Sequence, residues 1–155
     1  MTTSARLAEL EIDLPAVAAP VAAYVPAVIH GDIVQTSGQL PFVAGVLPQH
    51  GKVGDGDGLV STADAADLAR TSALNALAAA AAAVGDVDRI VGVHKVTGFV
   101  ASDPSFTGQP AVINGASLVL GEIFGEQGAH ARSAVGVAVL PLDAPVEVEV
   151  AFLLA

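Results

Sequence analysis

Two runs of β-branched residues lie at the start of the regular pattern, and they predict a β-hairpin. Residues 24–30 read YVPAVIH and residues 33–40 read IVQTSGQL. The Gly31-Asp32 pair between them suits a tight turn, because glycine readily adopts the positive φ angles that such turns require. Residues 41–60 are rich in glycine and keep no sustained period, which predicts a loop or an irregular hairpin.

Two later segments carry the apolar spacing and the end signals of α-helices. Ser61, followed three residues later by Asp64, forms a capping pattern, and the alanine-rich run from there to Gly85 predicts a helix of about 22 residues. A second helix is expected to start near Pro110, since proline is tolerated in a first turn, and to end at Gly125. Four of its apolar residues fall on one stripe: Ile113, Ala116, Leu120 and Phe124.

Three further segments, rich in valine and other apolar residues, are predicted to be strands. They are residues 89–101, 133–140 and 145–155, and the last two are joined by a short turn at residues 141–144. The expected order of elements is therefore β-β-α-β-α-β-β. Two helices can cover only one face of the sheet, yet both alternating faces of residues 133–140 are apolar or small. A second copy of the chain is the economical cover for the other face, so the pattern predicts a homo-oligomer.

The first twenty residues differ in character from the rest of the chain. They begin with a short polar and acidic helical candidate, followed by a stretch rich in proline and alanine. A helix cannot continue past Pro15 and Pro20, because proline lacks the required N–H group. Residues 1–20 are therefore expected to form a leader packed on the surface of one domain, residues 21–155.

Composition and charge limit the classes of partner that this chain is expected to bind. Of its 155 residues, 53% are hydrophobic and 14% are charged, and the formal net charge is −10. Such a surface repels a phosphate backbone, so nucleic acid is not an expected partner. No basic, apolar signal peptide is visible, and the longest apolar run, residues 76–84, is far shorter than the roughly 20 residues of a membrane span. Together with the absence of cysteine, these features predict a soluble cytoplasmic protein without a membrane partner.

Arg132 is the residue best suited to bind a small ligand. Strand alternation places it on the same face as three small residues that would leave room for a cleft: Ala134, Gly136 and Ala138. The planar guanidinium matches a carboxylate, so a small carboxylic acid is the expected ligand class. On spacing alone, the alternative is a surface salt bridge with one of the sixteen acidic residues.

The other polar residues carry weaker signals. Four histidines lack the spacing of metal ligands, and without cysteine no metal site is expected: His30, His50, His94 and His130. Only the last of them lies near Arg132. Glu147 and Glu149 share one face of the final strand, and a solvated outer position is the preferred interpretation for Glu149. The glycine-rich residues 51–58 match neither a phosphate loop nor a calcium loop, and no hydrolase triad motif is present.

Several motifs together resemble the Rid/YjgF family, the reactive-intermediate imine deaminases formerly described as endoribonuclease L-PSP proteins. They include AAYVPAV, QTSGQLP, VGDVDRIVGVHKVTGFV and QPAVINGAS. The most specific stretch is ARSAVGVAVLPLDAPVEVEV, in which an Arg-Ser opening, an apolar strand, Leu-Pro and an alternating Val-Glu strand follow one another. The resemblance covers residues 20–152 and favours a functional Arg132 over a surface salt bridge.

This resemblance implies a fold and an assembly. The fold is α+β and chorismate-mutase-like, of the bacillus type, with a mixed β-sheet and two helices packed on one face. The assembly is a homotrimer with three clefts between subunits, in which Arg132 of one subunit approaches Tyr24 or Ser37 of its neighbour.

The resemblance also implies a reaction and its residues. Arg132 would hold the substrate carboxylate and Glu147 would position a water molecule, as the two catalytic residues. Four more residues would bind substrate in the cleft: Tyr24, Ser37, Gly38 and Asn114. The reaction is hydrolysis of a 2-imino acid, such as 2-iminobutanoate or 2-iminopropanoate, or of its enamine, to a 2-keto acid and ammonia. It requires no metal or organic cofactor.

Some features depart from the family pattern and keep alternatives open. Many of its deaminases carry a cysteine two residues after the arginine, where this chain has Ala134. Extra residues at 50–58 and 102–108 lie near the expected cleft. The alternatives are a non-catalytic trimer that binds small carboxylates or keto acids, and an endoribonuclease. The net charge of −10 and the lack of paired histidines argue against the nuclease.

Overall fold

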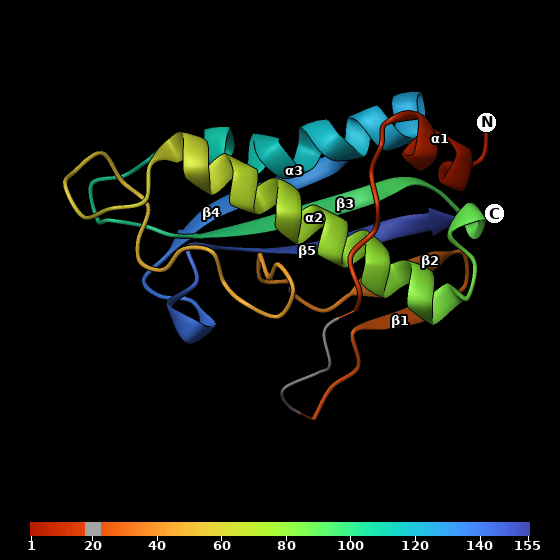
Figure 1. Cartoon of the computed structure of the whole chain (residues 1–155), viewed down its shortest axis with the longest axis horizontal. Coiled ribbons are helices and arrows are strands. Elements are labelled where there is room, and N and C mark those ends of the chain that lie inside the picture. The colour runs from red at the N-terminus through yellow and green to blue at the C-terminus, as the bar shows by residue number, and fades with distance from the viewer. Residues whose placement is uncertain (18–22) are drawn as a thin grey trace.

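A computed structural model describes residues 1–17 and 23–155, and within them the helices and strands follow the predicted order after a short N-terminal helix (Figure 1). The helices are α1 Thr3–Glu9, α2 Thr62–Val84 and α3 Gln109–Phe124. The strands are β1 Ala27–His30, β2 Ile33–Thr36, β3 Ile90–Ala101, β4 Ala131–Val137 and β5 Val146–Leu154. Short 3₁₀ turns occupy Val87–Arg89, Gly125–Gly128 and Pro141–Asp143. Pro20, expected to block a helix in the leader, lies outside the described residues.

The five strands form one mixed sheet in the order β1-β2-β5-β3-β4. The predicted hairpin is confirmed: β1 and β2 are antiparallel, and Gly31 at their turn has a φ of 60°. β3 pairs with β4 in parallel and with β5 antiparallel. A parallel pair needs a crossover, and α3 provides it between β3 and β4.

The connection between β4 and β5 differs from a hairpin. The short turn expected at residues 141–144 is present as the 3₁₀ turn Pro141–Asp143. The strands on either side of it are not paired, because β3 lies between them. The cause is the parallel pairing of β3 with β4, which leaves the other edge of β3 for β5. As a consequence, β4 and β5, which carry the most specific motif of the sequence, lie on either side of β3.

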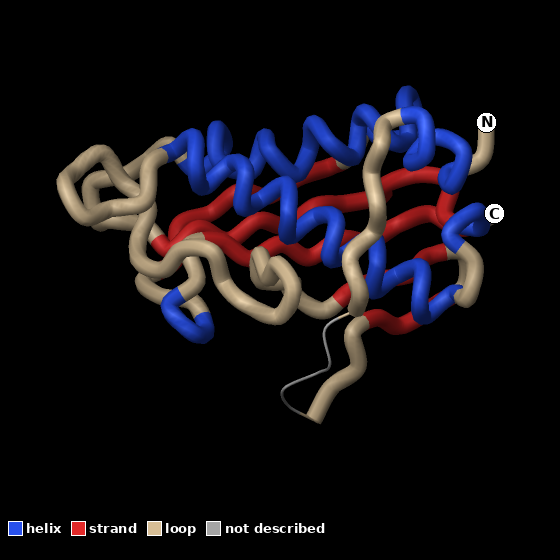
Figure 2. The backbone as a smooth tube through the Cα atoms, in the orientation of Figure 1, coloured by secondary structure: helices blue, strands red, loops and turns tan. Residues whose placement is uncertain are grey.

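Helices α2 and α3 pack side by side on one face of the sheet (Figure 2). Their close approach depends on Gly115, because a Cβ atom there would run into the carbonyl oxygen of Ala66 on α2. The core between helices and sheet contains fully buried side chains such as Leu77, Leu120 and Phe152. In the described part of the chain, no helix is long and apolar enough to cross a membrane.

The opposite face of the sheet carries no helix among the described residues, and we call it the open face (Figures 1 and 2). Its apolar side chains retain substantial exposure, as at Val135, the partner of Phe99 on β3, which is 44% exposed. Phe99 and Glu147, which are cross-strand partners on this face, are half-buried. The predicted two-helix cover on one face is thus confirmed, and the other face is left apolar and partly open.

Helix α1 is held on the domain by hydrogen bonds to the start of β3. The hydroxyl of Thr3 donates to the carbonyl oxygen of Ile90 (2.6 Å), and the backbone N–H of Ser4 donates to Asp88 (2.7 Å). These bonds from Ser4, first from its N–H and then from its hydroxyl, lower the pKa of Asp88 below its usual value. The division of the chain at residue 20 stays a prediction.

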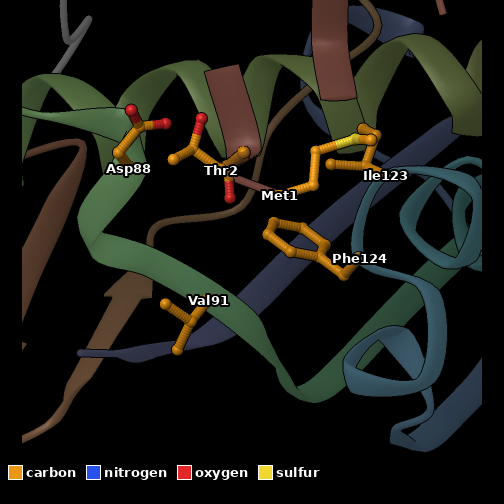
Figure 3. Close-up of a pocket in the computed structure, with 7 residues that line it drawn as sticks. Met1, Thr2, Asp88, Val91, Ile123 and Phe124 are labelled. Atoms are coloured by element: carbon orange, nitrogen blue, oxygen red, sulfur yellow. The ribbon is translucent and has the colours of Figure 1, made fainter. Parts of the chain in front are cut away.

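A cavity of about 260 Å³ lies beside this helix (Figure 3). Its lining includes Met1, Asp88, Val91 and Phe124. None of the predicted site residues lines it, so this cavity belongs to the packing of the N-terminal segment.

Candidate functional site

Arg132 lies near the start of β4 and points toward α3. Its Nη1 donates to Oδ1 of Asn114 (2.8 Å) and to Oγ of Ser117 (3.2 Å), and its Nη2 donates to the carbonyl oxygen of Pro110 (3.4 Å). Asn114 and Ser117 are three residues apart, so both side chains lie on the same side of the helix. Helix α3 therefore fixes one side of the guanidinium.

No carboxylate neutralises this guanidinium among the described residues. The ion pair that the described residues do form joins Arg6 to Glu9 within α1 (2.7 Å), near the start of the chain. The surface salt bridge considered for Arg132 is thus absent from the described structure. The Nε–H group of Arg132 donates no hydrogen bond to the described residues, and Nη2 donates only the one to Pro110. A half-buried cation with this free edge suits a carboxylate ligand.

The small residues beside Arg132 do not create open space, contrary to expectation. A Cβ atom on Gly136 would lie 2.7 Å from Nε2 of Gln109 on α3, and Ala134 packs against the core. Gly136 and Ala138 are exposed, and Ala138 follows the end of β4. Small side chains on this strand instead allow α3 to approach it closely, and this approach brings Asn114 to Arg132.

His130 extends the hydrogen-bonded group around Arg132. Its Nε2 lies 2.9 Å from Oγ of Ser117, and its Nδ1 lies 2.6 Å from the carbonyl oxygen of Gly128. We call Asn114, Ser117, His130 and Arg132 the Arg132 cluster. Ser117 was not predicted, although its place three residues after Asn114 was a usable signal.

The other predicted catalytic residue, Glu147, lies on the open face. Its neighbours Val146 and Val148 are fully buried on the helix side, so alternation turns Glu147 the other way. It packs directly on Gly38, where a Cβ atom would collide with Oε1 of Glu147. Gly38 is therefore required for the carboxylate to lie where it does.

Ser37 precedes Gly38 in the chain, and its hydrogen bonds hold the segment that follows Tyr24. The hydroxyl of Ser37 donates to the carbonyl oxygen of Val25 (2.7 Å), and its N–H donates to that of Pro26 (2.8 Å). These bonds tie the Tyr24 segment to the end of β2, and the Tyr24 side chain is 45% exposed. We call Ser37, Gly38 and Glu147 the Glu147 group.

The carboxyl of Glu147 has a raised pKa. Burial is the larger cause, and repulsion from the carboxylate of Glu149 on the same face adds to it. A carboxyl that holds its proton at a higher pH than usual is suited to proton transfer.

We expect Glu147→Gln to stabilise the protein at neutral pH. Between the ordinary carboxyl pKa and the raised pKa of Glu147, the folded state binds more protons than the unfolded state, so stability falls as pH rises through this window. The amide removes this loss. Urea unfolding at several pH values between about 4.5 and 8 should give the variant a higher free energy of unfolding at pH 7 and a flatter pH profile.

Glu149→Gln is the matched control, because it removes the smaller cause of the shift and leaves the buried carboxyl in place. It should give a smaller gain at pH 7. Equal gains from the two variants, or a loss in Glu147→Gln, would contradict the role of burial.

The Arg132 cluster and the Glu147 group are separated within one chain. Arg132 faces α3, whereas Glu147 faces away from the helices, so the two side chains lie on opposite faces of the sheet. Arg132 pairs with Val96 and Glu147 pairs with Phe99, which places their Cα atoms three residues and two strands apart, roughly 14 Å. Of the six predicted residues, the structure thus brings Arg132 to Asn114, and Ser37 and Gly38 to Glu147, with the Tyr24 segment adjacent.

Comparison with known proteins bears on this arrangement. A family model described as "YjgF/chorismate_mutase-like, putative endoribonuclease" matches residues 4–154. The chain belongs to the YjgF family. The YjgF match covers the sheet, both long helices and nearly all of α1, and it confirms the chorismate-mutase-like fold.

Three relatives illustrate the breadth of the YjgF family around this chain. Protein TCP17 of Trypanosoma cruzi is 44% identical over 149 residues, which cover 94% of this chain and 90% of TCP17. The crystal structure of Atu1372 from Agrobacterium tumefaciens, of unknown function, is 41% identical with a TM-score of 0.86, covering 99% of this chain and 92% of its own. E. coli TdcF, solved with bound serine, is 27% identical with a TM-score of 0.64, covering 90% and 94%.

Proposed function

We propose that this protein is a cytoplasmic, cofactor-independent hydrolase of reactive 2-imino acids and their enamines. The observation that carries the proposal is the guanidinium of Arg132, which three oxygen atoms orient and no acid neutralises among the described residues. Such a group offers a free hydrogen-bonding edge to a small carboxylate. Serine, the ligand named for the relative TdcF, is likewise a small carboxylic acid with a nitrogen on the adjacent carbon.

The complete site forms between subunits of a homotrimer. A 2-imino acid is too small to span the roughly 14 Å between Arg132 and Glu147 through the sheet of one chain. Packing the apolar open face against a neighbour removes exposed Val135 from water. The Arg132 cluster of one subunit then meets the Glu147 group and Tyr24 of the next.

Hydrolysis in this cleft needs positioning and one proton relay. The substrate carboxylate accepts hydrogen bonds from Nε and Nη2 of Arg132. The Ser37 hydroxyl, whose proton goes to Val25, accepts a hydrogen bond from the imine N–H. Glu147 orients a water molecule that adds to the imine carbon while its proton moves to nitrogen by way of the carboxyl. The resulting carbinolamine passes its hydroxyl proton to the amino nitrogen through the same carboxyl, and its C–N bond then breaks to leave a 2-keto acid and ammonia.

The decisive experiment measures keto-acid release from enzymatically generated 2-iminobutanoate and uses subunit mixing. Arg132→Ala and Glu147→Gln homotrimers should each be nearly inactive. Unfolding and refolding them together should restore activity, because some interfaces then combine an intact Arg132 with an intact Glu147. Refolding each variant alone is the control. No acceleration by the wild type would refute the hydrolase, and no recovery on mixing would refute the shared site.

Ligand binding and RNA cleavage, measured beside keto-acid release, separate the alternative functions. A non-catalytic trimer would bind 2-oxobutanoate, seen as thermal stabilisation, without turning over imines. The departure that motivates this alternative is the extra length of the chain at residues 50–58 and 102–108, near the expected cleft. An endoribonuclease is disfavoured by the net charge of −10, and RNA cleavage by scrupulously purified protein would revive it.

A further inference from the structure

We propose that His130 is a positioning residue, which orients the carboxylate-binding guanidinium of Arg132 through the hydroxyl of Ser117. This inference deepens the proposed function and rests on it. It adds two residues of this chain, neither of which contacts the reacting carbon, to the determinants of substrate binding.

The hydrogen-bond partners of His130 assign its tautomer. A carbonyl oxygen only accepts hydrogen bonds, so Nδ1, which is 2.6 Å from the oxygen of Gly128, carries the proton. In the neutral imidazole Nε2 is then an acceptor. Its partner at 2.9 Å, the hydroxyl of Ser117, must donate to it.

This tautomer fixes the direction of the Ser117 hydroxyl. With its proton committed to His130, the lone pairs of Oγ are free to accept the N–H of Arg132 at 3.2 Å. The chain of donors therefore runs in one direction, from Arg132 through Ser117 and His130 to Gly128. Since Asn114 accepts the second proton of Nη1 (2.8 Å), that end of the guanidinium is fully engaged. The opposite edge is left for a ligand.

The end of this chain is fixed to the same helix that carries Ser117. Gly128 packs so tightly on α3 that a Cβ atom there would lie 2.7 Å from the carbonyl oxygen of Leu120. The acceptor for His130 and the hydroxyl it controls thus belong to one packed unit. A side chain held by such a unit loses less rotamer freedom when it binds a ligand.

The test compares two amide substitutions that each keep half of the imidazole's hydrogen bonding. His130→Gln can place its amide oxygen near the position of Nε2 and accept from Ser117. His130→Asn can place its amide N–H near Nδ1 and keep only the bond to Gly128. Calorimetric titration with 2-oxobutanoate should show affinity about threefold to tenfold weaker in His130→Asn and close to wild type in His130→Gln.

Kinetics should follow the same pattern if the wild type hydrolyses 2-iminobutanoate. His130→Asn and Ser117→Ala should raise KM with little change in kcat, because the carboxylate clamp acts on ground state and transition state alike. His50→Gln is the matched control, since His50 also faces a carbonyl oxygen, that of Leu142 at 3.1 Å, but has no contact with Ser117. Its KM should stay at the wild-type value.

Failure of this inference is distinguishable from failure of the proposed function. If wild type binds 2-oxobutanoate and His130→Asn binds it equally well, the positioning role is refuted while the function stands. If even wild type neither binds nor reacts, the proposed function fails. The inference is then decided in the free protein by NMR: faster exchange of the Arg132 guanidinium protons in His130→Asn supports it, and unchanged exchange or a proton on Nε2 of His130 refutes it.

Discussion

Arg132→Ala is expected to lower kcat/KM for 2-iminobutanoate by about a hundredfold or more. The substitution removes two hydrogen bonds from a charged donor to the substrate carboxylate, each contributing about 1.5–3 kcal/mol. Arg132→Lys keeps the charge but cannot reproduce the planar fork held by Asn114 and Ser117, so it should recover only a small part of the loss. Steady-state kinetics with coupled keto-acid detection provides the measurement.

Arg89→Ala is the matched control for this loss. Arg89 is exposed, lies in the 3₁₀ turn before β3 and has no side-chain hydrogen bond within the described residues. Its variant should retain wild-type kcat/KM. A similar loss in both variants would point to general electrostatic attraction of the anionic substrate, and unchanged activity in Arg132→Ala would remove the carboxylate clamp from the mechanism.

Gly115→Ala is expected to destabilise the fold by about 2 kcal/mol or more. Alanine is favoured over glycine in helices by about 1 kcal/mol, but the added Cβ atom would collide with the backbone oxygen of Ala66 and push α3 away from α2. Backbone atoms of two packed helices cannot move aside as a flexible side chain can. Urea unfolding followed by circular dichroism should show a lower midpoint.

Gly121→Ala, on the same helix, is the control for intrinsic helix propensity. A Cβ atom at Gly121 would meet nothing within 4 Å. This variant should gain about 0.5–1 kcal/mol, as expected for an unhindered glycine in a helix. If both variants shifted stability in the same direction, the tight contact between α2 and α3 would not govern the packing.

The secondary structure was predictable because its signals are local. The cap at Ser61, the stop at Gly85 and the hairpin glycine Gly31 each act through neighbouring backbone groups, and all three lie at the ends predicted for them. Strand pairing is a long-range property that no local pattern encodes. For that reason the sequence placed a turn at residues 141–144 without revealing that β3 separates the strands on either side.

The candidate site was only partly accessible from the sequence. The chemistry of its guanidinium singled out Arg132, and motif resemblance added the catalytic role of Glu147 and the binding role of Asn114. Alternation counted within one strand could not assign these residues to faces of a sheet. The small residues Ala134 and Gly136 were interpreted as space for a ligand, and they serve the approach of α3 instead. Ser117 was missed because a single serine on an amphipathic helix is ordinary until its partner His130 is placed beside it.

The placement of Arg132 and Glu147 on opposite sides of one sheet has a consequence for regulation. Under the proposed assembly, a lone subunit owns two half-sites that belong to two different reaction centres, so dissociation is itself an inactivation. Specific activity would then fall when the protein is diluted, and the concentration at which half of it is lost would match the midpoint of subunit association. A molecule that loosens the contact between subunits would silence the enzyme without competing with substrate at all.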